Sequence, residues 1–255
     1  MAALAVLPNL SFAESNEDLA KASQNPLTSM INVPVQNNSN LGIGPDDSTQ
    51  NVLNIQPVIP FGVNDDWNLI TRTIIPVVSY PDHLTGDGRI NGIGDTTLTA
   101  WFSPTTSDFI WGAGPVFLLP TATDDALGSD KWGAGLSAII VMMPGKWVIG
   151  TLMSNVWSVG GTGEQDINLF TWQYFVNYNL GDGLYITSAP MINANWEADD
   201  DHRWTVPFGI GMGQIFSIAG QKIDGQISAY KNVITPDDYG ADWQVRAQLK
   251  FMFPK

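Results

Sequence analysis

The segment from Asp242 to Phe253 alternates apolar and polar residues almost without a slip. In an extended strand, one face would carry the apolar residues Trp243, Val245, Ala247, Leu249, Phe251 and Phe253. In a soluble sandwich that face turns into the core, whereas in a transmembrane β-barrel it meets lipid and the polar face lines an enclosed lumen. One strand does not separate these folds, so the rest of the chain has to decide.

The composition favours the barrel. Charged residues make up 14% of the chain, against about 25% in globular proteins. The chain is 44% hydrophobic, yet it contains no apolar run of the roughly 18 residues that a transmembrane helix needs. The net charge of −14 argues against a nucleic-acid partner. Without cysteine, there is no disulfide framework and no thiol chemistry.

From residue 29 onward the chain predicts twelve strands, each long enough to cross an outer membrane when tilted. Their predicted ranges are 29–37, 50–60, 67–80, 93–103, 109–121, 132–143, 147–159, 167–179, 184–196, 203–216, 222–234 and 242–253. Every second link is short, such as "PGK" or "LGDG", and the links between them are generally longer and acidic. Short turns on one rim and long loops on the other are typical of bacterial outer-membrane barrels, whose even strand number returns both termini to one side.

Tryptophan and proline positions test this interpretation. Nine of the ten tryptophans lie near predicted strand ends, as an aromatic girdle requires. We assign Trp67, Trp101, Trp111 and Trp147 to the short-turn rim, and Trp132, Trp157, Trp196, Trp204 and Trp243 to the long-loop rim. If Asp95 faces the lumen, alternation places Trp101 there too, which weakens its place in the girdle. Bulges or local openings are expected at the prolines inside strands, which are Pro34, Pro57, Pro76, Pro115, Pro190 and Pro207.

The N-terminal residues add two segments before the barrel of residues 29–255. Residues 1–13 are apolar and place Ser11 and Ala13 where a secretory signal peptide has small residues, although the basic region is missing, as in a truncated signal. Residues 14–28 predict a short helical segment that begins with a Ser15/Asp18 capping box and stops at Asn25-Pro26.

Several longer stretches resemble one family. They are "DLAKASQNP", "QNVLNIQPVIPF", "DDWNLITRTIIP", "LPTATDDALGSDKW", "QYFVNYNL", "TSAPMINANW", "RWTVPFG" and "FMFPK". The family comprises Gram-negative outer-membrane transporters catalogued under the "MetA-pathway of phenol degradation" and sometimes labelled neuromedin U. The resemblance runs from about Asp18 to Lys255. It implies a barrel and a transport role, and it brings no established catalytic or binding residues.

With apolar faces outward, the polar faces of several strands should line the lumen and contact solute. The expected lining residues are Asn54, Gln56, Arg72, Asp95, Gln173, Asn177, Asn193, Asn195, Asp224, Gln226, Gln244, Arg246, Gln248 and Lys250. Three cations among them, Arg72, Arg246 and Lys250, could favour anionic or polar solutes. Alternatively, these groups hydrogen-bond across a filled interior that has no continuous pore. Ion pairs of the arginines with Asp95 or Asp224 would also consume the charge.

The second faces of the strands from 109 to 159 are apolar, with Ile110, Val116, Leu118, Ile139, Val141, Leu152 and Val156. An apolar lumen wall could conduct a hydrophobic solute, and the strand prolines could open a lateral exit towards lipid. Packing against the helix of residues 15–24 would explain the same surface. Acidic pairs in the long loops, such as Asp124-Asp125, suit a solvated surface better than a calcium or magnesium site.

The sequence therefore predicts an all-β protein of the bacterial outer membrane, an antiparallel barrel of about twelve strands with a short N-terminal helix. The predicted function is passive uptake of a small solute, with hydrophobic or aromatic molecules among the candidates, and no cofactor or metal is expected. The alternatives are a lipid-modifying hydrolase, for which only His83 and His202 could act as base, and a structural barrel without a pore. The expected partners are outer-membrane lipids, lipopolysaccharide, the solute and, during biogenesis, the barrel assembly machinery.

Overall fold

A computed structural model describes residues 15–81, 88–107 and 109–253. One helix, α1 (Asn16–Gln24), precedes all the strands. The strands are β1 (Ile31–Ile43), β2 (Ser48–Ile55), β3 (Val58–Gly62), β4 (Trp67–Tyr80), β5 (Ile90–Ile93), β6 (Thr96–Pro104), β7 (Ile110–Leu119), β8 (Lys131–Met142), β9 (Trp147–Gly161), β10 (Asn168–Gly181), β11 (Leu184–Ser188), β12 (Met191–Asn195), β13 (Trp204–Ile218), β14 (Gln221–Ile234) and β15 (Trp243–Phe253).

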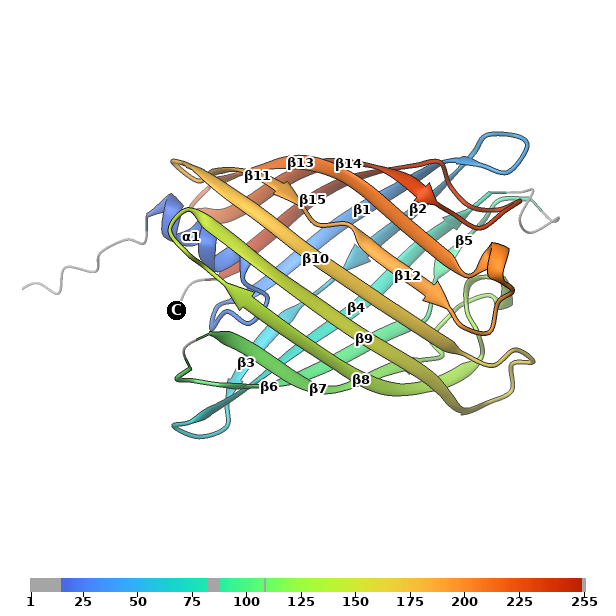
Figure 1. Ribbon diagram of the computed structural model, residues 1–255, viewed down its shortest axis with the longest axis horizontal. Coiled ribbons are helices and arrows are strands. Elements are labelled where there is room, and N and C mark those ends of the chain that lie inside the picture. The colour runs from blue at the N-terminus through green and yellow to red at the C-terminus, as the bar shows by residue number, and fades with distance from the viewer. Residues whose placement is uncertain (1–14, 82–87, 108, 254–255) are drawn as a thin grey trace, which may run out of the picture.

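These strands form one closed antiparallel barrel (Figure 1). The first strand, β1, pairs with the last, β15, and β9 pairs with β10, so the sheet has no free edge. Three spanning strands are interrupted, as β2 with β3, β5 with β6 and β11 with β12, so the fifteen strand segments make twelve spanning strands. The predicted all-β, twelve-stranded barrel with a short N-terminal helix is confirmed. In the described part of the chain, no helix has the length and apolar character that crossing a membrane requires.

The outer face of the barrel is apolar. Large side chains at mid-strand, including Leu136, Phe208 and Ile210, are more than 60% exposed. On β15 the polar residues are buried or half-buried and point inward, while Trp243, Leu249 and Phe253 are exposed. This arrangement is the inverse of a soluble β-sandwich, because the solvent around the barrel is hydrocarbon.

The prolines coincide with breaks in the ladders. Pro57 separates β2 from β3, and Pro190 separates β11 from β12. Pro34 and Pro76 lie opposite the β2/β3 and β5/β6 breaks, where their carbonyls accept from Gln56 and Gly94 at 2.8 and 2.9 Å. The register of β13 on β14 shifts at Pro207, and the β6–β7 pairing skips Pro115. Each ring removes a ladder donor, and the neighbouring strands adapt locally.

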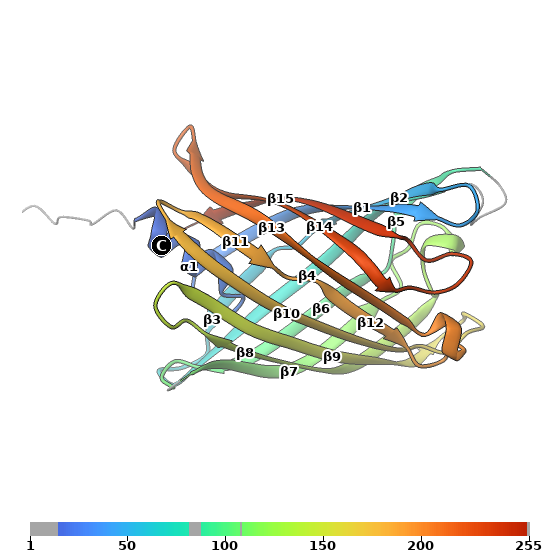
Figure 2. The same ribbon diagram turned by 45° about the horizontal axis from the view of Figure 1, so that its top comes forward.

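The two rims differ as expected. Helix α1 and the end of β15 lie at the same end of the barrel, where the links between strands are short (Figures 1 and 2). The opposite end carries the longer connections 120–130, 162–167, 196–203 and 235–242. One difference is that β1 continues to Ile43 instead of ending at residue 37, which shortens its link to β2 to residues 44–47.

Most of the predicted tryptophan girdle faces outward. The exposed rings are Trp67 and Trp147 at one rim, and Trp132, Trp157, Trp196 and Trp243 at the other. Trp111 and Trp204 are half-buried and pack edge-on against exposed girdle rings at centroid distances of 6.0 and 5.4 Å. The assignment of Trp101 to the girdle was wrong. Its ring is 1% exposed and lies inside the barrel, where its indole N–H donates to Ser137 at 3.0 Å.

Candidate solute pathway through the barrel

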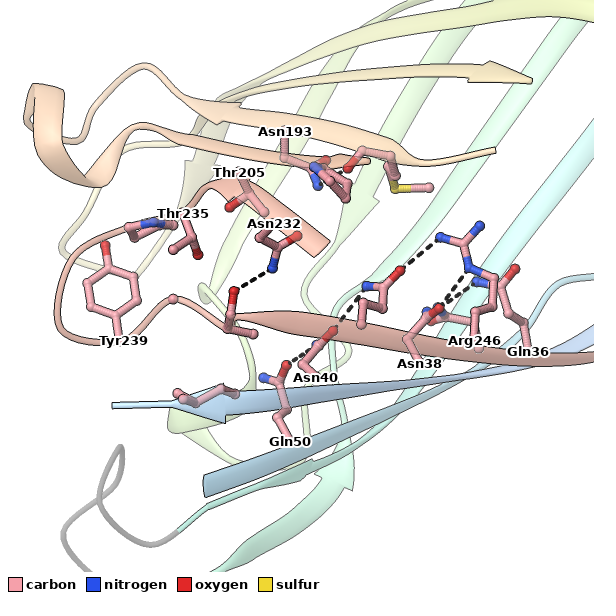
Figure 3. A pocket seen from close by; sticks show the side chains of 18 of the residues that line it. Gln36, Asn38, Asn40, Gln50, Asn193, Thr205, Asn232, Thr235, Tyr239 and Arg246 are labelled. Carbon is pink, nitrogen blue, oxygen red and sulfur yellow. Dashed lines mark hydrogen bonds between the residues drawn. The ribbon is translucent and has the colours of Figure 1, made fainter. Parts of the chain in front are cut away.

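Three cavities occupy the lumen. The largest, about 740 Å³, opens towards the long-loop rim, and Figure 3 shows its polar lining. A second, about 130 Å³, lies against residues 23–26 at the end of α1. A third, about 200 Å³, is bordered by the inward faces of β4, β6 to β10 and β12. We call them the vestibule, the inner chamber and the side chamber.

Twelve of the fourteen residues predicted to line the lumen border one of these cavities. The vestibule takes Asn54, Gln56, Arg72, Asn193, Gln244 and Arg246. The inner chamber shares Gln56, Arg72 and Arg246 and adds Gln173, Asn177, Asp224, Gln226, Gln248 and Lys250. Their binding to a solute stays a prediction.

The remaining two, Asp95 and Asn195, do not border the cavities. The Asp95 carboxylate accepts from the backbone N–H of Ser129 at 2.8 Å and from the Ser129 hydroxyl at 2.7 Å, so it braces the loop before β8. Asn195 stands at the end of β12, where its side-chain oxygen caps the N–H of Glu197 at 3.1 Å. Both side chains stabilise connections at the long-loop rim.

Arg246 closes the break between β11 and β12 from inside the barrel. The carbonyl of Ala189 has no ladder partner there and accepts from Arg246 Nη1 at 2.8 Å and Gln173 Nε2 at 3.4 Å. The Ala189 N–H donates to the Tyr230 hydroxyl at 3.4 Å, and the guanidinium lies 5.0 Å from the Tyr230 ring. Polar lumen side chains thus satisfy the backbone that the proline break frees, which water could not do from the lipid side.

Arg246 has further amide partners. Its Nε donates to Asn38 at 3.0 Å and its Nη2 to Gln244 at 3.1 Å (Figure 3). Among the described residues, neither lumen arginine forms an ion pair, so the anticipated pairing with Asp95 or Asp224 does not occur.

Asp224 instead ties α1 to the barrel. Its carboxylate, 1% exposed, accepts from the Ser23 hydroxyl and from the Tyr185 hydroxyl, the latter at 2.6 Å. Lys250 Nζ lies 3.9 Å from the carboxylate and donates to the Ser23 carbonyl at 2.6 Å. The carboxylate of Asp224 and the ammonium of Lys250 therefore bind the last turn of the helix.

Helix α1 begins as predicted, because Ser15 accepts from the Asp18 N–H at 3.1 Å and donates to the Asp18 carboxylate at 2.6 Å. Its Leu19 and Ala20 are buried in a cluster with Met30, Ile215 and Met252. Gln24 exchanges two hydrogen bonds with Asn179 on β10. The helix is thus seated on the inner wall at the short-turn rim.

The apolar wall packs against Leu27, which lies outside the helix of residues 15–24, and it also borders a cavity, while conduction of a solute along it stays a prediction. Near the short-turn rim, Leu27, which follows α1, packs against Trp101, Ile139 and Val141 in a dry cluster. Further along, the same wall borders the side chamber with Val116, Leu118, Leu152 and Val156. The N-terminal segment therefore covers only part of the apolar surface.

Reasoning from the sequence missed the inward row of β1. Gln36, Asn38 and Asn40 border the vestibule, and Asn40 donates to Gln50 at 2.6 Å (Figure 3). Their signal was available, because every second residue from Asn32 to Asn40 except Pro34 is an amide. On β14, Ser228, Tyr230 and Asn232 continue the same lining by hydrogen-bonding to neighbouring lumen groups or the loop.

The long-loop rim offers little catalytic chemistry in the described residues. His202 stacks on Tyr239 at 5.4 Å, and no hydroxyl hydrogen-bonds to its ring. Partial burial raises the pKa of the Tyr239 phenol. His83 lies outside the described residues, as does the segment 1–13. No three His, Asp or Glu side chains of the described ranges converge as metal ligands would.

Comparisons with known proteins agree with this fold. Over 88% of this chain and 95% of the other, the structure matches the COG4313 outer-membrane channel from Pseudomonas putida F1, with a TM-score of 0.64 and 20% identity. The NanC porin matches over 88% of this chain and all of its own, with a TM-score of 0.52 and 11% identity. The outer-membrane phospholipase A from Escherichia coli has a TM-score of 0.47 at 11% identity, over 95% of this chain and 99% of its own. Comparison by sequence with curated proteins gives no match.

The closed barrel and its apolar outer face are those of a protein of the bacterial outer membrane. A family model described as "Putative MetA-pathway of phenol degradation" matches residues 34–255, which is most of the sequence. The protein therefore belongs to the MetA-pathway of phenol degradation family, as the resemblance implied.

Proposed function

We propose that the barrel is a channel that passively admits a small solute with a hydrophobic or aromatic body. The observation that carries this proposal is the lumen itself, which is hollow and amphipathic. A polar vestibule of about 740 Å³ adjoins an apolar side chamber of about 200 Å³. A barrel whose interior side chains merely filled the space would leave no cavities of this size.

The proposed route runs along the barrel axis. It enters between the long loops, passes the level of Arg72 and Arg246, and reaches the inner chamber beside α1. The wall break at Ala189 is closed from inside by hydrogen bonds, which favours the axial route over a lateral one at that point. Release at the short-turn rim then requires α1 to move, because residues 23–26 border the inner chamber.

The two rival functions have less support. A lipid hydrolase needs a nucleophile held by a base, and His202 faces Tyr239 instead. A purely structural barrel would not need an apolar chamber next to buried cations. Contact with membrane lipid agrees with the exposed apolar belt, while contacts with lipopolysaccharide and the assembly machinery stay predictions.

Flux into liposomes tests the proposal. Protein refolded into vesicles should admit a small charged aromatic such as benzenesulfonate, which crosses bare bilayers slowly, faster than empty vesicles do, and a variant lacking residues 15–28 should admit it faster still. Phospholipid turnover should be absent in both. If neither form raises the flux above that of empty vesicles, the barrel is not a channel.

A further inference from the structure

The three cations of the lumen differ in how many of their N–H donors are free to bind a solute. Lys250 forms an ion pair with Asp224 and donates a hydrogen bond to the Ser23 carbonyl. Arg246 donates through all three of its nitrogens, to Asn38, Ala189 and Gln244. Arg72 makes one hydrogen bond, from Nη2 to Gln56, and its Nε and Nη1 donate to no described group.

Arg72 also occupies a singular place. It is the one described residue that borders the vestibule, the inner chamber and the side chamber together. Its side chain is partly exposed to these cavities and has no carboxylate partner among the described residues. A guanidinium carries five N–H donors in a planar fork that matches a carboxylate. The unused edge of the fork has the geometry to receive a carboxylate.

The side chamber that begins at Arg72 is mainly apolar, with Gln173 and several hydroxyls among its lining residues. Its lining includes Ile74, Trp101, Val116, Leu118, Leu152, Val156, Leu169 and Met191. Of its hydroxyls, Ser137 already accepts from Trp101 and donates to the Met153 carbonyl. The volume of about 200 Å³ suits one ring, since an apolar cavity of about 150 Å³ can bind benzene.

We infer that Arg72 and the side chamber together form a binding site for a ring-sized organic carboxylate. The carboxylate lies on the free edge of the guanidinium, and its aromatic or alicyclic body fills the side chamber. This inference rests on the proposed function, because it names the class of solute that the channel selects.

Charge favours an anion over a cation at this point. The level of Arg72 carries Arg246 and Lys250 against the single carboxylate of Asp224, and these four groups border the inner chamber. The acidic loops at the rim do not reverse this preference, because salt screens exposed charges beyond about 8 Å at physiological ionic strength. The loops slow the entry of an anion more than they weaken its binding.

Three isosteric probes test the inference. These are 4-fluorobenzoate, neutral 4-fluorobenzamide and cationic 4-fluorobenzamidine, whose fluorine line widths report binding to the full chain in lipid nanodiscs. The dissociation constant of the benzoate should be about tenfold below that of the benzamide, as expected for one charge-assisted hydrogen-bonded pair. The benzamidine should bind more weakly than either.

Two variants and one control identify the site. Arg72→Gln should bring the benzoate to within about twofold of the benzamide, whereas Arg89→Gln removes the same charge at the long-loop rim and should change nothing. Thr97→Phe places a ring in the side chamber. The Thr97 hydroxyl makes no hydrogen bond with the described residues, so this change strands no partner. It should weaken the benzoate and the benzamide alike, at least fivefold.

Equal affinities for the benzoate and the benzamide in the native protein would overturn the inference. So would equal losses in the Arg72→Gln and Arg89→Gln variants, which would indicate only a long-range charge effect. The proposed function fails separately. Benzoate binding without flux into vesicles would refute the channel and leave the site, whereas flux without charge preference would leave the channel and refute the site.

Discussion

Helix α1 gives the sharpest test of how the pathway is closed. Leu19 is 1% exposed and packs with Met30, Ile215 and Met252. Leu19→Ala removes most of this apolar contact, and such truncations of buried leucines cost about 2–5 kcal/mol. A helix of nine residues does not persist alone in water. Undocking and unfolding of α1 are therefore one event, and the substitution acts on that event directly.

The size of the effect follows from this cost. A loss of about 2.8 kcal/mol multiplies the undocked population about a hundredfold. The polar contacts of Ser23 and Gln24 remain, so the helix stays docked for most of the time. We expect the frequency of open events to rise about a hundredfold. The conductance of each open event should equal that of the variant lacking residues 15–28, because the open pore is the same.

Single-channel recording in planar bilayers measures both quantities. Lys21→Ala is the matched control, since it alters the same helix and removes only the exposed pair with Glu17 at 3.6 Å, which contributes less than about 1 kcal/mol. If Leu19→Ala opens no more often than Lys21→Ala, or if deletion of residues 15–28 leaves the current unchanged, α1 does not gate the barrel.

Other contacts yield three further predictions. Asp224→Asn should lower the free energy of unfolding by about 2 kcal/mol, read from urea denaturation in vesicles, because the substitution leaves Lys250 without its counter-charge and weakens two hydrogen bonds. Asp95→Ala should make the loop it braces the first site of proteolytic cleavage, with an unchanged barrel core. The hydrogen bond from Lys131 lowers the pKa of the Asp166 carboxyl. The stabilisation of the folded state by the Lys131–Asp166 hydrogen bond is therefore complete above pH about 4 and is lost as the pH falls through the lowered pKa. Amide exchange in that loop should accordingly differ between native protein and Asp166→Asn at pH 7 and converge near pH 2.

The barrel could be predicted from the sequence because its constraint is local. A strand between lipid and lumen must alternate apolar and polar residues along its own length, so about ten residues are enough to show which face points outward. Where alternation fades, the prediction fails. The first strand was predicted to end at residue 37, where Asn37 and Ser39 interrupt the apolar row of Ile31, Val33 and Val35, but the ladder with the neighbouring strands continues to Ile43. A strand ends where its partner ends, and the partner is elsewhere in the sequence.

Trp101 is a second case in which the position of a residue depends on strands elsewhere in the sequence. Tryptophan near a strand end indicates a membrane girdle when only sequence is considered. In β6, however, the inward row is Thr97, Thr99, Trp101 and Ser103, and it faces an apolar wall contributed by β7 to β9. The ring is buried because those strands leave an apolar space opposite it. Strand-by-strand reasoning does not see that space.

Which lumen cation keeps free hydrogen-bond donors also depends on contacts between residues far apart in the sequence. Arg72, Arg246 and Lys250 have similar signatures in the sequence, since each is a cation on the polar face of an alternating strand. They differ only in what the other strands bring to them. Arg246 hydrogen-bonds to the backbone at the break between β11 and β12, and Lys250 hydrogen-bonds to the N-terminal helix. Arg72 borders the side chamber and donates, among the described side chains, only to Gln56. The donors that each lumen cation keeps free are therefore set by the strand breaks and the helix around it, and a relative whose break or helix differs should keep a different cation free.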